Sequence, residues 1–166
     1  MKTFLYSVLL SVCFTTHAKE DPQYPVSAIP EDLRKGAYAV IREDAMIFTI
    51  LSKSTATLKA HLVVTIFNDN GKHFAKETVY YDKLCKITSL RAQVFDGNGM
   101  LIKRLKANEI TDHSAFEGLY SDARVKIADL IQGQYPYTVE FEYEVAYKFL
   151  YDIQGSAMDP YEDVSV

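Results

Sequence analysis

The chain has 166 residues, of which 48% are hydrophobic and 24% are charged. This length and composition suit one domain that buries its own core. The formal net charge of −4 excludes a general nucleic-acid binder, because such a protein needs a basic surface. With only 7 glycines and 5 prolines, no linker or low-complexity segment divides the chain.

The first 18 residues have the pattern of a secretory signal peptide. Lys2 supplies the positive start, residues 4–14 are largely apolar, and Thr16-His17-Ala18 places small residues where a signal peptidase reads them. The apolar run is too short to span a membrane. We therefore predict cleavage between Ala18 and Lys19 and export to the periplasm or out of the cell. The alternative is a buried N-terminal helix.

Removal of this segment would also remove Cys13 and leave Cys85 as a lone cysteine. A lone cysteine cannot form an internal disulfide, so the fold must depend on its hydrophobic core. Cys85 has no glycine-rich elbow or predicted helix start beside it, and we interpret it as a packing residue. The alternative is a catalytic nucleophile.

Residues 19–37 are predicted to form an extended lead-in followed by a short helix. The helix falls in residues 29–36, which have a proline near the start, acids in the first turn, bases in the last turn and a glycine at the end. Residues 38–166 are predicted to form one β-sandwich-like module. Its last three residues, Val164-Ser165-Val166, alternate like the start of a strand, so we expect the module to be truncated there.

Strand patterns follow one another through this module. Predicted strands cover residues 37–42, 45–51, 57–67, 74–81, 87–95, 100–105 and 123–131, whereas residues 107–120 are predicted to be irregular, with room for a helical turn. Residues 45–51 are apolar on both faces and are predicted to be buried. The segments Asn68 to Gly71 and Asp96 to Gly99 contain residues that tolerate positive φ, and both predict hairpin turns.

The strongest strand signal is YPYTVEFEYEVAYKF, residues 135–149. Its odd positions are apolar or aromatic and its even positions are mainly polar, which is the period of an extended strand. We expect Glu140, Glu142 and Glu144 to face water and the aromatic face to be covered by a second layer. The sequence thus predicts a mainly β fold, an antiparallel β-sandwich-like two-layer sheet with one short N-terminal helix.

No catalytic constellation is visible in the sequence. The possible histidine and cysteine ligands His61, His73, Cys85 and His113 do not have the paired spacing of zinc sites. The two turns lack the later oxygen ligands of a calcium loop, and there is no phosphate loop, dinucleotide fingerprint or serine elbow. The three glutamates share one strand face, as a solvated face does, rather than forming paired catalytic acids. We therefore predict no catalytic residue, no metal site and no cofactor.

Four segments in this order resemble a known family: residues 29–33 (IPEDL), 93–99 (QVFDGNG), 119–125 (LYSDARV) and 135–147 (YPYTVEFEYEVAY). They resemble domain-of-unknown-function family 3857, the β-rich N-terminal module of exported bacterial transglutaminase-like proteins. Apart from the first of these segments, the resemblance covers residues 38–166, and it consists of turn and strand patterns. It implies a catalytic domain downstream, whose Cys, His and Asp would lie beyond Val166. It transfers no catalytic residue to this chain.

Three functional hypotheses remain. The first is a non-catalytic module that positions substrate for, or interacts with, a downstream transglutaminase-like domain or a partner protein. The second is a small enzyme that uses Cys85 with His61 or His113. The third is a carbohydrate-binding sandwich that stacks sugars on its tyrosines: Tyr135, Tyr137, Tyr143 and Tyr147. We expect no nucleic-acid partner and no transmembrane helix in the mature chain, whereas the ligand and the oligomeric state stay open.

Overall fold

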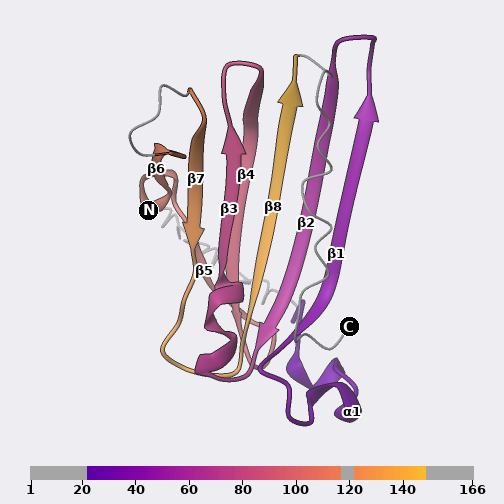
Figure 1. The fold of residues 1–166 in the computed structure, drawn as a ribbon. Helices are drawn as coiled ribbons and strands as arrows, with labels where there is room; N and C mark the ends of the chain where they lie inside the picture. Colours follow the sequence, from indigo (N-terminus) through magenta and orange to yellow (C-terminus); the bar gives the residue numbers. More distant parts are fainter. Residues whose placement is uncertain (1–21, 117–121, 149–166) are drawn as a thin grey trace, which may run out of the picture.

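The structure is a computed structural model, and it describes residues 22–116 and 122–148 (Figure 1). The predicted signal peptide, its cleavage between Ala18 and Lys19, and the predicted strand start at residues 164–166 lie outside the described residues. None of the described helices is both long and apolar enough to cross a membrane.

Two antiparallel sheets make up the fold. The larger has five strands in the order β1-β2-β8-β4-β5, and the smaller has three in the order β3-β7-β6. The five strands are β1 (Ala39–Ile50), β2 (Ala56–Ile66), β8 (Tyr137–Tyr147), β4 (Cys85–Asp96) and β5 (Leu101–Arg104). The three strands are β3 (Lys76–Tyr81), β7 (Arg124–Asp129) and β6 (Thr111–Ser114).

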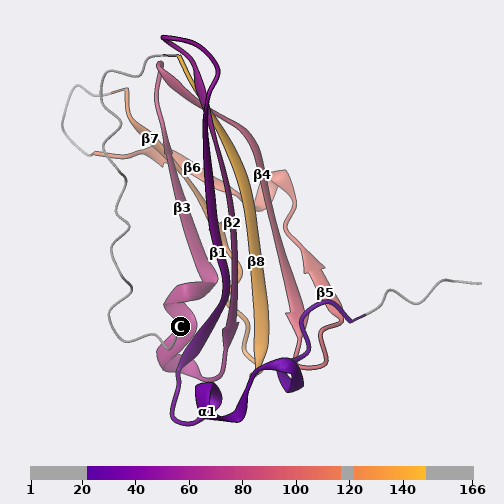
Figure 2. The ribbon, with the colours of Figure 1, turned by 90° about the vertical axis from the view of Figure 1, so that its right-hand side faces the viewer.

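The smaller sheet lies against one face of the larger one, near β4 and β8, while β1 and the far end of β2 extend past it (Figures 1 and 2). We call this the inner face and the opposite one the outer face. Two short helices precede β1, namely η1 (Val26–Ala28) and α1 (Glu31–Arg34), and two lie between strands, namely η2 (Asp69–Ala75) and η3 (Ala107–Glu109). This arrangement confirms the predicted β-sandwich-like fold and the short helix near the N-terminus.

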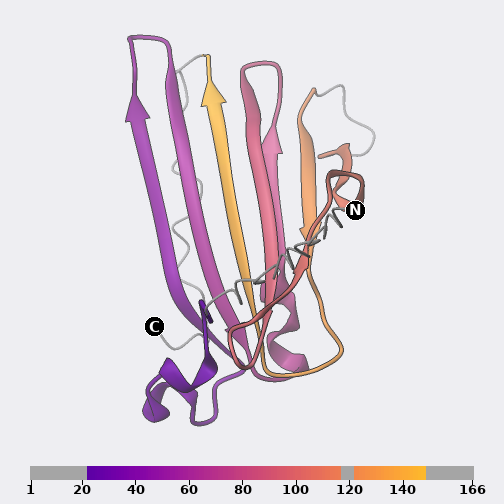
Figure 3. The same ribbon diagram turned by 180° about the vertical axis from the view of Figure 1, so that it is seen from behind.

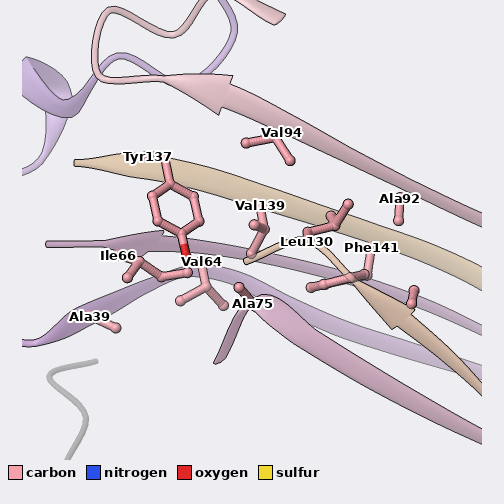
Figure 4. Close-up of a cluster of buried hydrophobic side chains, with 11 residues drawn as sticks. Ala39, Val64, Ile66, Ala75, Ala92, Val94, Leu130, Tyr137, Val139 and Phe141 are labelled. Atoms are coloured by element: carbon pink, nitrogen blue, oxygen red, sulfur yellow. The ribbon is translucent and has the colours of Figure 1, made fainter. Parts of the chain in front are cut away.

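Strand β8, which the long alternating pattern predicted, lies at the centre of the larger sheet. It pairs over its whole length with β2 on one side and β4 on the other. Its odd-numbered side chains point to the inner face, where Tyr137, Val139 and Phe141 join the core. The core cluster also includes Val64, Ile66, Ala75, Ala92, Val94, Ala128 and Leu130 (Figure 4).

Strand β1 differs from the prediction in two ways. Residues 37–42 and 45–51 were expected as separate strands, but they form one strand with an irregularity between Ile41 and Glu43. The expected burial of residues 45–51 is wrong, because β1 is an edge strand whose far half lies beyond the smaller sheet. The large apolar side chains of residues 46–51 are between 37% and 63% exposed: Met46, Ile47, Phe48, Ile50 and Leu51.

The hairpin expected at Asn68 to Gly71 is also wrong. The Asn68 side chain accepts a hydrogen bond from the backbone N–H of Asn70 and starts the 3-10 helix η2, which leads into the other sheet. Gly71 packs so closely that a Cβ there would lie 2.4 Å from the carbonyl oxygen of Tyr38. A contact made 33 residues away, rather than turn propensity, thus decides the local path.

The turn at Asp96 to Gly99 is confirmed and joins β4 to β5. The Asp96 carboxylate accepts hydrogen bonds from the backbone N–H groups of Asn98 and Met100, each at 2.9 Å. Gly99 has φ +83, which glycine adopts without strain. Residues 107–120 were expected to be irregular with room for a helical turn, and they contain the 3-10 helix η3 as well as β6, a short exposed strand that was not predicted.

Candidate functional site

The N-terminal segment of the described chain is packed on the outer face rather than extended into solvent. The backbone N–H of Gln23 donates to Gly99 O, and that of Val26 donates to Gly97 O, both at 3.0 Å. The Tyr24 ring meets Phe95 of β4 edge-on, with ring centroids 5.0 Å apart. The expected lead-in therefore covers the end of the outer face near the β4–β5 turn (Figure 3).

The polar centre of the outer face is a hydrogen-bonded group that we call the Glu140 cluster: Tyr24, Glu43, His61, Gln93 and Glu140. Glu140 is only 8% exposed although it carries a carboxylate. Its Oε1 accepts from the Tyr24 hydroxyl at 2.8 Å and lies 2.9 Å from His61 Nε2. Its Oε2 accepts from Gln93 Nε2 at 2.9 Å. A buried carboxylate thus has a partner on both oxygens.

This burial corrects one expectation. Glu140 was expected to face water together with Glu142 and Glu144, and it does not, because Tyr24 covers it. Glu142 and Glu144 remain partly exposed. Strand alternation placed all three on one face, but only the tertiary structure decided which of them is buried.

His61 bridges two carboxylates. Its Nδ1 lies 2.9 Å from Glu43 Oε1, and its Nε2 lies 2.9 Å from Glu140 Oε1. Burial lowers the pKa of His61, but the hydrogen bonds to Glu140 and Glu43 outweigh it and raise the net pKa above the ordinary value. In the imidazolium form both ring nitrogens donate, so the cluster favours a protonated His61.

Tyr24 is held from a second side by Arg42. The guanidinium lies over the Tyr24 ring at 5.5 Å from its centroid, and its Nη1 donates to the carbonyl oxygen of Pro25 at 3.2 Å. Burial and the contact with Glu140 raise the pKa of Tyr24, so its hydroxyl stays a hydrogen-bond donor. Burial lowers the pKa of Arg42. The cluster therefore fastens residues 22–25 to β1, β2 and β8 at once.

Beyond the cluster, the outer face has a shallow depression of about 440 Å³. Its charged side chains form cross-strand pairs. Lys59 lies 3.5 Å from Glu144, and Arg91 lies 2.9 Å from Glu142. Within the described chain, no group of three or more His, Cys, Asp or Glu side chains could hold a metal ion. The depression therefore presents mixed, internally paired charges.

Cys85 and His61 are not brought together. Cys85 begins β4 opposite Tyr147 on the inner face, whereas His61 lies opposite Glu142 on the outer face. Burial, followed by the hydrogen bond with Asp82, raises the pKa of the Cys85 thiol, which favours the unreactive thiol over the thiolate. His113 lies on exposed β6, with its Nδ1 2.9 Å from Ser114 O.

The tyrosines considered for sugar stacking lie toward the inner face. Tyr137 is 1% exposed, and its ring is 5.5 Å from that of Tyr135. Tyr147 packs against Phe48 at 5.7 Å, and Tyr143 is half-buried. Figure 4 shows Tyr137 among the core side chains. These rings pack within the fold rather than form one open platform.

Sequence reasoning missed the partners of Glu140. Tyr24 lies 116 residues from Glu140, and His61 lies 79 residues from it. No spacing rule connects such positions. The available signal was the histidine His61 within the strand predicted at residues 57–67, and it becomes informative only once β2 is placed beside β8.

Comparison with solved structures gives the fold class of this chain. The fold is similar to a solved structure from Parabacteroides distasonis ATCC 8503, provisionally described as a protease, with a TM-score of 0.56 and 12% sequence identity. The match covers 67% of this chain and 23% of that one, so the matched part corresponds to less than a quarter of that protein's chain. This likeness supports the fold class alone. A search of curated proteins gave no match.

The family follows from a sequence match. Residues 52–161 match the family described as "Domain of Unknown Function with solved-structure structure (DUF3857)". The match extends over more than half of the chain, and the chain belongs to this family.

Proposed function

We propose that this chain is a non-catalytic, exported β-sandwich module that serves an enzyme domain, of the transglutaminase-like kind, by positioning its substrate or by contacting it. The observation that carries the proposal is the DUF3857 match over residues 52–161, together with the fold match to 23% of a longer protein. A match confined to 23% of a longer chain suits a module that is joined to other domains.

The chemistry of the described side chains supports the same proposal. Glu140, the least exposed carboxylate among the described residues, uses both of its oxygens in hydrogen bonds within the cluster. The charges of the outer depression neutralise each other in pairs. The Cys85 thiol has a raised pKa and lies on the face opposite His61. Such an arrangement suits a stable scaffold with a polar face.

The proposal is tested by comparing the 166-residue chain with the natural gene product, if the gene encodes residues after Val166. Each protein is assayed for amide hydrolysis and acyl transfer on a glutamine-containing peptide. We expect activity in the longer protein alone, with an essential Cys, His and Asp beyond Val166. Activity of the 166-residue chain by itself would contradict the proposal.

The substitution Cys85→Ser separates this proposal from the cysteine-enzyme alternative. We expect unchanged catalytic behaviour and a loss of about 1–3 kcal/mol in the free energy of unfolding, because a half-buried hydroxyl replaces the thiol. Loss of a measured activity with the circular dichroism spectrum intact would support the alternative.

A further inference from the structure

The edge of β1 that faces away from β2 is unprotected. β1 is the last strand of the larger sheet, and no described strand pairs with its outer side. Residues 45–50 read AMIFTI and carry no charge, proline or glycine. Native sheets usually protect an edge with a charge, a proline or a bulge. The irregularity of β1 lies between Ile41 and Glu43, at the other end of the strand.

The hydrogen bonds of the hairpin show which backbone groups this edge presents. The backbone N–H of Leu51 donates to Thr55 O at 2.9 Å, so these two residues are a hydrogen-bonded pair. In an antiparallel ladder such pairs recur at every second residue, which assigns residues 45, 47 and 49 to the bonds with β2. The N–H and C=O groups of Met46, Phe48 and Ile50 therefore point outward from the edge.

A bond on the far side of β8 gives the same alternation independently. The backbone N–H of Lys148 donates to Leu84 O at 2.7 Å, so the even-numbered residues of β8 bond to β4 and the odd-numbered ones to β2. Through the registers of β8 with β2 and of β2 with β1, this again leaves the even-numbered residues of β1 facing outward.

We propose that a second copy of this chain pairs with this edge, antiparallel, about a two-fold axis at Phe48. Phe48 then lies opposite Phe48 of the second copy, and Met46 lies opposite Ile50. These are the residues whose backbone groups are open, so the pairing forms about six new backbone hydrogen bonds. The two larger sheets become continuous, with both inner faces on the same side.

A second copy fits this edge because the edge is self-complementary. The inner-face side chains Met46, Phe48 and Ile50 are 43%, 37% and 63% exposed, and the pairing sets them against each other. It also places aromatic rings directly opposite, which stabilises cross-strand pairs. At the margins, the negative Glu43 of one copy meets the positive Lys53 of the other. The interface is isologous and closes as a dimer.

The first test is sedimentation equilibrium of the full chain over a range of concentrations. One edge gives a small interface, so we expect a dissociation constant of roughly 0.01–1 mM. Ile50→Lys should weaken association at least about tenfold, because it places a charge against Met46 of the second copy. The matched control is Ile102→Lys, at a side chain 55% exposed on the opposite edge strand, and it should change the constant less than about twofold.

The second test fixes the register. In a Cys85→Ser background, Phe48→Cys should give a disulfide-linked dimer on mild oxidation, because a hydrogen-bonded pair has its Cα atoms about 5.5 Å apart. Thr49→Cys should not, because the axis at Phe48 moves the two copies of residue 49 out of disulfide range. Cross-linking through residue 49 and not through residue 48 would overturn the pairing.

Amide hydrogen exchange of the wild-type chain shows whether a second copy or another segment of the same chain pairs with the edge of β1. We expect the amides of Met46, Phe48 and Ile50 to exchange quickly at low concentration and to gain protection as the dimer forms. A chain that stays monomeric near 1 mM overturns the proposal. Protection of these three amides in that monomer would show that another segment of the same chain occupies the edge.

Discussion

Replacing Glu140 by glutamine tests whether the Glu140 cluster holds the lead-in on the sheet. The carboxylate accepts from Tyr24 and Gln93 and bridges to His61, all at 2.8–2.9 Å, and is 8% exposed. Hydrogen bonds to a charged group contribute about 1.5–3 kcal/mol each, against about 0.5–1.5 kcal/mol for neutral pairs. In Glu140→Gln three hydrogen bonds are weakened, and the new side-chain amide N–H₂ faces groups that already donate. We therefore expect the free energy of unfolding to fall by about 3–4 kcal/mol.

The matched control is Glu144→Gln, on the same strand and face. The Glu144 side chain is 34% exposed, and its partner Lys59 is 64% exposed at 3.5 Å. Exposed ion pairs contribute little, so we expect a change of at most about 1 kcal/mol. Both variants are measured by urea unfolding followed by circular dichroism, where an unchanged m value shows that the comparison is valid. Losses equal within about 0.5 kcal/mol would refute the structural role of Glu140.

Glu140→Gln should also change how the free energy of unfolding depends on pH. The folded state raises the pKa of His61, so the stability from its protonation is fully present below the unfolded pKa of 6.5 and is lost as pH rises through the raised folded value. Glu140→Gln removes the strongest of the partners that raise this pKa. The difference in unfolding free energy between wild type and variant should therefore shrink above that folded pKa. A difference independent of pH between 5 and 9 would contradict the assigned hydrogen bonds.

Three further substitutions test separate features. Tyr24→Phe should cost about 1–2 kcal/mol and speed proteolysis of residues 22–28, whereas Tyr135→Phe, whose hydroxyl makes an exposed contact at 3.4 Å, should be nearly neutral in the same urea assay. Burial raises the pKa of Glu77 to about 7, so its contribution is present below pH 4.5 and is lost as pH rises through 7. The free energy of unfolding of Glu77→Gln, relative to wild type, should therefore be about 1–2 kcal/mol higher at pH 8 than at pH 4. The same difference at both pH values would contradict the burial of Glu77. Gly99→Ala should cost about 2 kcal/mol or more, because φ is +83 and the new Cβ would lie 2.6 Å from Pro25 N, whereas Gly133→Ala meets nothing within 4 Å and serves as its thermal-unfolding control.

The sequence by itself determined the elements whose signal is local. The period of two in residues 135–149 predicted β8, and the same reasoning predicted β2, β4 and the fold class. The Asp96 turn was predictable because its side chain bonds to backbone groups two and four residues away. These features follow from backbone geometry and side-chain alternation, which operate within a few residues of the chain.

Only the tertiary structure decided what depends on the order of the strands and on their partners. Residues 45–51 have the composition of a buried strand, yet they are exposed because β1 lies at the edge, beyond the smaller sheet. Glu140 has the composition of a solvated face, yet it is buried because Tyr24 and His61 reach it from 116 and 79 residues away. A single sequence contains no local signal for either, because burial is set by what packs against a residue rather than by the residue itself.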